Sequence, residues 1–188
     1  MSSPSLRGAT LAGLRAVARD AIAHGLREGR PPELDPGLYP DALREPRASF
    51  VTLHRHGELR GCTGSLEPDA PLVVGTARNA FRAAFADPRF PPLAAAELGS
   101  IEISVCVLSP LEPLAVRSEA ELLARLRPGV DGLVLRDGGH AATFLPAVWE
   151  TLPTPEAFVG ALLRKAGLAP GHWSPALRFA RYTTESAA

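Results

Sequence analysis

Apolar residues recur at the spacing of an α-helix in four segments of the chain. In the first of these, Leu11, Leu14, Ala18 and Ile22 fall on one side while arginines occupy the other, which predicts an amphipathic helix over 6–28. The other three predicted helices cover residues 70–86, 118–126 and 154–165. Ser118 with Glu121 fits a capping box, and Gly167 marks the end of the last helix.

Alternation of apolar and polar residues predicts strands between these helices. The stretch ASFVTLHRHGELRGCTG is typical of a hairpin whose two-residue turn is His56-Gly57. That turn would set Leu53 opposite Arg60 and Val51 opposite Cys62, so that all four side chains share one face. Further strands are expected at 101–108, in a second hairpin around Asp137-Gly138-Gly139, and at 176–184, where the chain would return to the first sheet.

Hairpins that alternate with helices predict an α+β fold with mainly antiparallel sheets. The proline-rich segment 31–46 is read as a connection with at most one short helix.

Composition narrows the classes of function. The chain has 188 residues, 46% of them hydrophobic, and 20 basic against 20 acidic side chains give zero formal net charge. This balance argues against broad nucleic-acid or anionic-membrane binding, which needs surplus positive charge. Arginines interrupt the first apolar run, which is unlike the uncharged core of a secretory signal peptide. The two cysteines lie 44 positions apart and form no zinc-binding pattern. We therefore expect a reduced, cytoplasmic protein without metal or cofactor.

Cys62, in LRGCTG, is the strongest candidate for chemistry. A lone cysteine in a strand is more often a small buried hydrophobe than a nucleophile. In favour of reactivity, Arg60 is near enough to stabilise a thiolate, and the flanking glycines allow a ligand or another backbone to approach. Against it, no histidine or aspartate has the local spacing of a base.

Charged residues elsewhere leave similar alternatives. Asp87 and Arg89 flank Pro88 in a rigid turn, as a local ion pair or as groups aimed into a binding site. Glu102 interrupts an apolar strand, and Arg60 is its expected partner if the two strands are neighbours. That pairing predicts a face displaying Arg60, Cys62, Glu102 and Ser104.

The histidines are interpreted as surface residues. His54 and His56 form an HxH pair, a geometry that some metal sites use, but the pair runs into a solvated turn. His24 and His172 have no partners in sequence and are expected to be exposed, as is His140 at the start of a strand after Gly138-Gly139. Glycine-rich phosphate loops, HExxH and GxSxG are all absent from the sequence.

Several stretches together resemble the AMMECR domain family, whose bacterial and archaeal members are called AmmeMemoRadiSam system protein A. LRGCTG is similar to the LRGCIG hexapeptide of that family, with Thr63 in place of isoleucine. The likeness continues through FADPRFPPLAAAEL, IEISVCVL, GVDGLVLRDGGHAATFLPAV, LLRKAGL and LRFARY, and so covers residues 8 to 184.

The resemblance implies two subdomains, each with a mainly antiparallel sheet flanked by helices, and a cleft between them. The larger would comprise 1–110 and 173–188, and the smaller 111–172. Carried over by motif, the hexapeptide would face the cleft. The implied binding positions are Arg60, Gly61, Gly64, Asp87, Arg89, Phe90 and Lys165, with Glu102 added from the strand pattern and Cys62 as candidate catalytic residue.

No established reaction accompanies the resemblance, and a fold alone does not supply one. The system name implies association with a Memo-like protein and a radical SAM enzyme. Two hypotheses follow: an enzyme or enzyme subunit that acts on a sizeable substrate near Cys62, with Arg60 orienting an anionic group, or a non-catalytic module that binds a protein or ligand with those partners.

Overall fold

The computed structural model describes residues 8–187 of the chain. These residues form an α+β fold with two four-stranded antiparallel sheets, and the chain divides into two compact units. The first unit contains the residues up to Ser109 together with the C-terminal residues from Glu185, and the second is Pro110–Thr184. No helix among the described residues is long and apolar enough to cross a bilayer.

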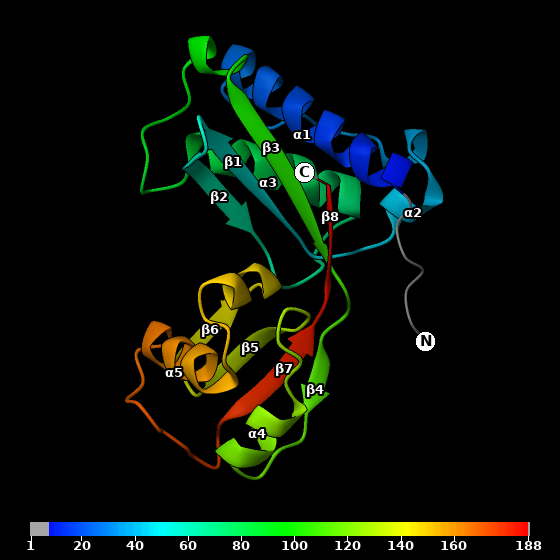
Figure 1. Cartoon of the computed structure of the whole chain (residues 1–188). Helices are drawn as coiled ribbons and strands as arrows, with labels where there is room; N and C mark the ends of the chain where they lie inside the picture. The colour runs from blue at the N-terminus through cyan, green and yellow to red at the C-terminus, as the bar shows by residue number, and fades with distance from the viewer. Residues whose placement is uncertain (1–7, 188) are drawn as a thin grey trace. The chain divides into compact units, whose positions relative to one another are not determined.

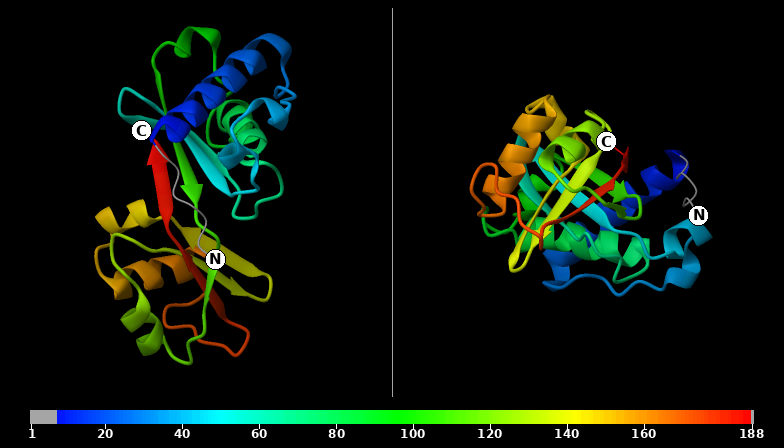
Figure 2. Two further views of the ribbon diagram at one scale, coloured as in Figure 1. Left: turned by 90° about the vertical axis from the view of Figure 1, so that its right-hand side faces the viewer. Right: turned by 90° about the horizontal axis from the view of Figure 1, so that it is seen from below.

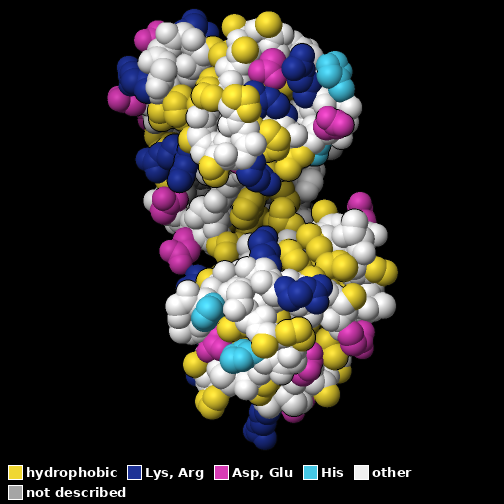
Figure 3. All heavy atoms as spheres, turned by 90° about the vertical axis from the view of Figure 1, so that its left-hand side faces the viewer, with side chains coloured by type: hydrophobic (Ala, Val, Ile, Leu, Met, Phe, Trp, Pro, Cys, Tyr) yellow, Lys and Arg dark blue, Asp and Glu magenta, His cyan; other side chains and the backbone are white. Residues whose placement is uncertain are grey.

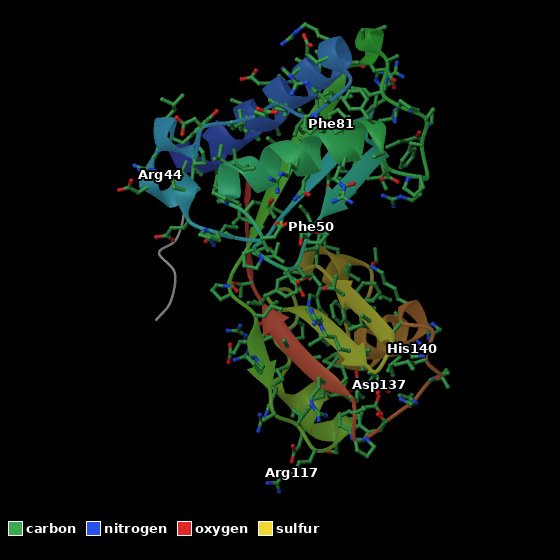
Figure 4. The ribbon with its side chains drawn as sticks, turned by 180° about the vertical axis from the view of Figure 1, so that it is seen from behind. Arg44, Phe50, Phe81, Arg117, Asp137 and His140 are labelled. Carbon is green, nitrogen blue, oxygen red and sulfur yellow. The ribbon has the colours of Figure 1, made fainter. Side chains whose placement is uncertain are left out.

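The first sheet has the strand order β2-β1-β3-β8. Its strands are β1 (Ser49–Arg55), β2 (Glu58–Gly64), β3 (Ile101–Leu108) and β8 (Thr184–Ala187). Helices α1 (Gly8–Glu28) and α3 (Leu72–Phe85) pack on one face of it, and Figure 4 shows α3 in front of the strands. The buried side chains of the strands, such as Val51, Leu53 and Val105, meet those of the helices, such as Leu14 and Ala80, in a single core.

The connection from α1 to β1 contains a 3-10 turn (Pro36–Leu38) and the four-residue α2 (Asp41–Arg44). Another 3-10 turn (Ala95–Glu97) lies between α3 and β3. The predicted helices at 6–28 and 70–86 and the strand at 101–108 are confirmed over the described residues.

The second sheet has the order β4-β7-β5-β6. It consists of β4 (Glu112–Leu114), β5 (Gly132–Asp137), β6 (His140–Phe144) and β7 (Arg178–Tyr182). Helices α4 (Glu119–Arg125) and α5 (Pro155–Lys165) lie together on one side of it, as Figure 2 shows, and a 3-10 turn (Pro146–Glu150) precedes α5. Trp149 stacks on Phe158 with 3.9 Å between ring centroids in the core of this unit.

The expected helix caps are present in this unit. The hydroxyl of Ser118 accepts from the backbone N–H of Glu121, and that of Thr154 accepts from Ala157. The Glu121 carboxylate, however, accepts from the backbone N–H of Arg117, one residue before the cap. Gly167 follows the end of α5 and has φ of 77°, the left-handed conformation in which glycine commonly ends a helix, as its position in the sequence predicts.

One strand prediction is wrong in its partner. The strand expected at 176–184 exists as β7, but it pairs with β4 and β5 in the second sheet. The chain then passes from β7 into β8, which lies beside β3 in the first sheet (Figure 1). β4 was not predicted, because three residues within a proline-containing segment carry no visible alternation.

Candidate functional site

The β1–β2 hairpin turns at His56-Gly57, as predicted. His56 has φ of 54° and Gly57 has φ of 82°, and two successive positive values match the twist of antiparallel strands. Arg55 lies opposite Glu58, again as expected. Beyond this point the predicted register is wrong.

A bulge shifts the register by one residue. His54 pairs with Leu59 and Leu53 pairs with Gly61, so Arg60 has no residue opposite it on β1. Cys62 therefore lies opposite Thr52, not Val51. The predicted common face of Cys62 with Val51 and Leu53 is wrong, because those two residues are buried in the core beneath the helices.

Cys62 instead points to the sheet face away from α3. Its Sγ lies 3.2 Å from the Thr52 hydroxyl, and Thr52 is in turn opposite Ser104 on β3. Cys62, Thr52 and Ser104 form a polar row across three strands, and all three are half-buried. A second cysteine, Cys106, is on the same strand as Ser104.

The two glycines beside Cys62 accommodate neighbouring groups of the protein itself. A Cβ on Gly61 would lie 2.1 Å from the carbonyl oxygen of Ala83 in α3. On Gly64 it would lie 2.3 Å from the ring of Phe50, a residue labelled in Figure 4, and 2.6 Å from the Ser49 carbonyl oxygen. These close approaches explain both glycines, and a role in binding for either stays a prediction.

The segment after α3 brings Asp87 to β2. One oxygen of the Asp87 carboxylate accepts the backbone N–H of Cys62 at 2.9 Å. The same carboxylate accepts from the backbone N–H of Arg89 and, in bidentate fashion, from its guanidinium at 3.0 and 2.7 Å. Because β2 is an edge strand, the backbone N–H of Cys62 would have no strand partner on that side, and Asp87 accepts its hydrogen bond instead.

These bonds set the charge state of the Asp87–Arg89 pair. The Arg89 side chain, followed by the backbone N–H groups, holds the pKa of the buried Asp87 well below its usual range. The Asp87 carboxylate in turn raises the pKa of Arg89 through its hydrogen bonds. The same Asp87 oxygen accepts from the Cys62 backbone N–H and from the Arg89 guanidinium, so this carboxylate joins Arg89 to the backbone of Cys62.

Glu97 organises the neighbouring arginines. Its carboxylate accepts from Arg60 at 2.9 and 3.1 Å, from Arg55 at 3.1 Å and from the backbone N–H of Ala94 at 2.9 Å. The hydrogen bonds from Arg60, and after them the one from the Ala94 N–H, lower the pKa of Glu97 to about 2. Burial acts in the opposite direction and is outweighed. Arg55 also donates to the Ser100 hydroxyl.

An aromatic ring joins the two ion pairs. The guanidinium carbons of Arg60 and Arg89 lie 5.9 and 5.5 Å from the centroid of the Phe90 ring, within the range of cation–π attraction. We refer to these six residues as the edge cluster: Arg55, Arg60, Asp87, Arg89, Phe90 and Glu97. Three guanidinium groups against two carboxylates leave the cluster with one excess positive charge.

The expected pairing of Arg60 with Glu102 is wrong. β1 lies between β2 and β3, so the two residues are on strands that are not neighbours, and Glu97 is the partner of Arg60. Glu102 lies opposite His54, is exposed, and lines a hollow with Arg15 and Arg19 of α1. Sequence reasoning missed Glu97, although it lies in FADPRFPPLAAAEL, one of the stretches that carry the family resemblance.

Lys165 belongs to the second unit. Its ammonium group donates to the carbonyl oxygen of Thr143 at 3.0 Å and lies 5.0 Å from the centre of the Phe144 ring. These contacts are within the same unit, and a role for Lys165 in binding stays a prediction.

Two histidine predictions are corrected. His172 is half-buried and its Nε2 lies 2.5 Å from the Asp137 carboxylate, which also accepts from Ser174 at 2.9 Å. His172 and, less strongly, Ser174 lower the pKa of Asp137 against the effect of burial. His24 is half-buried as well, and its Nε2 is buried without a hydrogen-bond partner. His140 is exposed as expected.

On the face seen in Figure 3, basic and acidic side chains are interspersed among hydrophobic ones, in agreement with the balanced composition. Among residues 8–187 there is no group of three or more His, Cys, Asp or Glu side chains arranged to hold a metal ion.

Comparison with known proteins agrees with the motifs and the fold. A protein of Methanothermobacter thermautotrophicus is 39% identical over 175 residues, which are 90% of this chain and 88% of the relative. A protein of Thermococcus onnurineus is 40% identical and covers 84% of this chain and 78% of its own length. The crystal structure of the uncharacterized protein PH0010 from Pyrococcus horikoshii superimposes with a TM-score of 0.88 at 32% identity, covering 96% of this chain and 92% of that one. The AMMECR1 family model matches residues 15–187, and the chain belongs to this family.

Proposed function

We propose that this protein is an enzyme, or a subunit of an enzyme, that binds a sizeable anionic substrate beside the edge cluster and acts on it through the thiol of Cys62. The observation that carries the proposal is the placement of Cys62, whose backbone N–H binds the same Asp87 oxygen as the Arg89 guanidinium and whose half-buried Sγ lies 3.2 Å from the Thr52 hydroxyl. A nearby positive charge favours the thiolate, which is the nucleophilic form of cysteine.

The excess positive charge of the edge cluster supports an anionic substrate. Arg60 has its Nη1 buried without a hydrogen-bond partner, whereas the side chain of Arg89 is 53% exposed. Arg89 is therefore the group that contacts an incoming anion. The sequence had suggested Arg60 for this role. In a nucleophilic step, Sγ would form a bond to an electrophilic centre while the leaving group departs with its electron pair.

Part of this proposal is that the activity belongs to a pathway with a Memo-like protein and a radical SAM enzyme, and the family resemblance supports it. The edge cluster is compatible with such a role, because a product released by one enzyme can be held through its charge for the next. The experiment for this level is an untargeted comparison of metabolites and modified proteins in cells with and without the gene.

One observation favours a non-catalytic binding module as the second candidate. Arg60 and Arg89 each already have a carboxylate partner. The cluster is therefore also explained by a structural role, in which it fixes the loop after α3 to the edge strand β2. Cys62→Ser separates the two candidates. An enzyme loses its pathway function with this variant, whereas a binding module keeps it.

The chemistry of Cys62 is tested by its rate of alkylation with iodoacetamide at neutral pH, read at each cysteine by mass spectrometry. Cys106, half-buried like Cys62, is the internal control. We expect Cys62 to react faster than Cys106, Arg89→Gln to slow Cys62 severalfold, and Arg89→Lys, which keeps the charge, to preserve its rate. Equal rates at both cysteines, unchanged in Arg89→Gln, would overturn the proposal of a nucleophile.

A further inference from the structure

The side chain of His54 lies on the same face of the first sheet as the Cys62 thiol. Side chains alternate along a strand, and Leu53, the neighbour of His54 on β1, is buried in the core beneath the helices. Thr52, on the other side of Leu53, therefore shares the opposite face with His54. Since the Cys62 Sγ lies 3.2 Å from the Thr52 hydroxyl, the thiol belongs to that face as well.

The strand register makes His54 and Cys62 diagonal neighbours. Cys62 lies directly opposite Thr52, and His54 is the next residue of β1 on that face. Diagonal neighbours in a sheet are about 7–8 Å apart, which is within reach of aromatic and long side chains. The register expected from the sequence would have set Cys62 opposite Val51, on the other face. The bulge at Arg60 therefore creates this neighbourhood of imidazole and thiol.

A carboxylate lies on the far side of His54. Glu102 on β3 is directly opposite His54, and β1 separates β3 from β2, as Figure 1 shows. Glu102 is exposed, whereas His54 and Cys62 are half-buried. Three neighbouring strands thus present a thiol, an imidazole and a carboxylate in this order. Activated nucleophiles have the same order, in which a base adjoins the nucleophile and a third group orients the base.

We propose that His54 is the general base for Cys62 and that Glu102 is a positioning residue for the His54 ring, an inference that rests on the proposed function. None of the hydrogen bonds within residues 8–187 engages the ring nitrogens of His54, so the ring is free to turn towards the thiol. Such contacts often tighten only when substrate binds. A ring nitrogen takes the thiol proton, Sγ bonds to the electrophilic centre, and the leaving group departs with its electron pair. The imidazolium then releases the proton to the leaving group or to water.

The pH profile of Cys62 alkylation by iodoacetamide in the full chain, read at each cysteine by mass spectrometry, tests the inference. The pH range includes the titration of an ordinary imidazole and of an ordinary thiol, about 6.5 and 8.5. In the unaltered protein the rate should already be high at neutral pH. In His54→Gln it should rise only where an unassisted thiol ionises, so the rate at neutral pH should fall about tenfold, since such a thiol is only a few per cent ionised there. Glu102→Gln should shift the profile in the same direction by a smaller factor.

His56→Gln is the matched control, because it removes the same group from the exposed hairpin turn two residues away. It should leave the profile of Cys62 unchanged, and the rate at Cys106 should be the same in every variant. The role of His54 is overturned if Cys62 reacts faster than Cys106 and keeps its rate and pH profile in His54→Gln, an outcome that leaves the nucleophile in place. An unchanged profile in Glu102→Gln would overturn the positioning role. Equal rates at the two cysteines of the unaltered protein would overturn the proposed function itself, and this inference with it.

Discussion

At the scale of single residues, Glu97 has the greatest influence on the site. One carboxylate accepts hydrogen bonds from two arginines on two strands and from the start of its own 3-10 turn. Arg60, 12% exposed at its side chain, depends on this carboxylate for compensation of its charge. Removing one partner of such a pair leaves a charge in a poorly solvated place.

We expect Glu97→Gln to lower the free energy of unfolding by about 2 kcal/mol at neutral pH, since hydrogen bonds to charged groups contribute about 1.5–3 kcal/mol. Glu102→Gln, at an exposed carboxylate, is the matched control and should change little. Urea unfolding followed by circular dichroism measures both. Equal stability of the two variants would contradict the central role of Glu97.

Acid should remove the contribution of Glu97. Its pKa falls from 4.5 to about 2 in the folded chain, chiefly through Arg60. The unfolded chain therefore takes up a proton at higher pH than the folded one, so the stabilisation is full above pH 4.5 and is lost as the pH falls towards 2. The difference in stability between the unaltered protein and Glu97→Gln should shrink over this window.

At the scale of elements, the decisive contact is that of α3 on β2. The helix backbone approaches so closely that the position of Gly61 has no room for a side chain, and the bulge at Arg60 lies directly beside this contact. Bulges re-aim side chains and bend strands. Here the bulge brings Cys62 opposite Thr52, while Arg60 pairs with Glu97.

Gly61→Ala should therefore destabilise the protein by about 2 kcal/mol or more, because the new methyl group meets the Ala83 carbonyl oxygen of the helix backbone. Gly75→Ala, within α3 itself, is the control. A Cβ there has no heavy atom within 4 Å, so the change should be neutral or stabilise by up to about 1 kcal/mol. Denaturant midpoints that move equally for both would argue against this packing.

At the scale of the whole molecule, each unit has its own sheet and its own hydrophobic core. The second unit is continuous in sequence, whereas the first needs β8 from the C-terminal end to complete its sheet. A unit with a complete sheet and core can fold alone.

We expect a fragment of residues 110–184 to fold cooperatively. Trp149, stacked on Phe158, should give it a near-ultraviolet circular dichroism signal like that of the full chain. A fragment of 110–177 lacks β7, the strand between β4 and β5, and should stay unfolded. A fragment of 110–184 without a cooperative thermal transition would show that the unit depends on the rest of the chain.

The sequence predicted those parts of the fold and site that depend on local patterns. Helical periodicity located the long helices, and the His56-Gly57 turn located the hairpin, because both follow from the preferences of a few neighbouring residues. The motifs also selected Cys62, Arg60, Asp87, Arg89 and Phe90, which the structure brings together around β2.

Only the tertiary structure decided which side chains meet. The bulge at Arg60 reversed the face of Cys62, since a shift of one residue moves a strand side chain to the opposite face. The order of strands separates Arg60 from Glu102, and Arg60 pairs with Glu97 instead. β7 belongs to the second sheet and not to the first. The composition and periodicity of the chain determined its helices with their apolar faces and its longer strands. Strand order and register arise from contacts between residues distant in sequence, and local patterns do not record them.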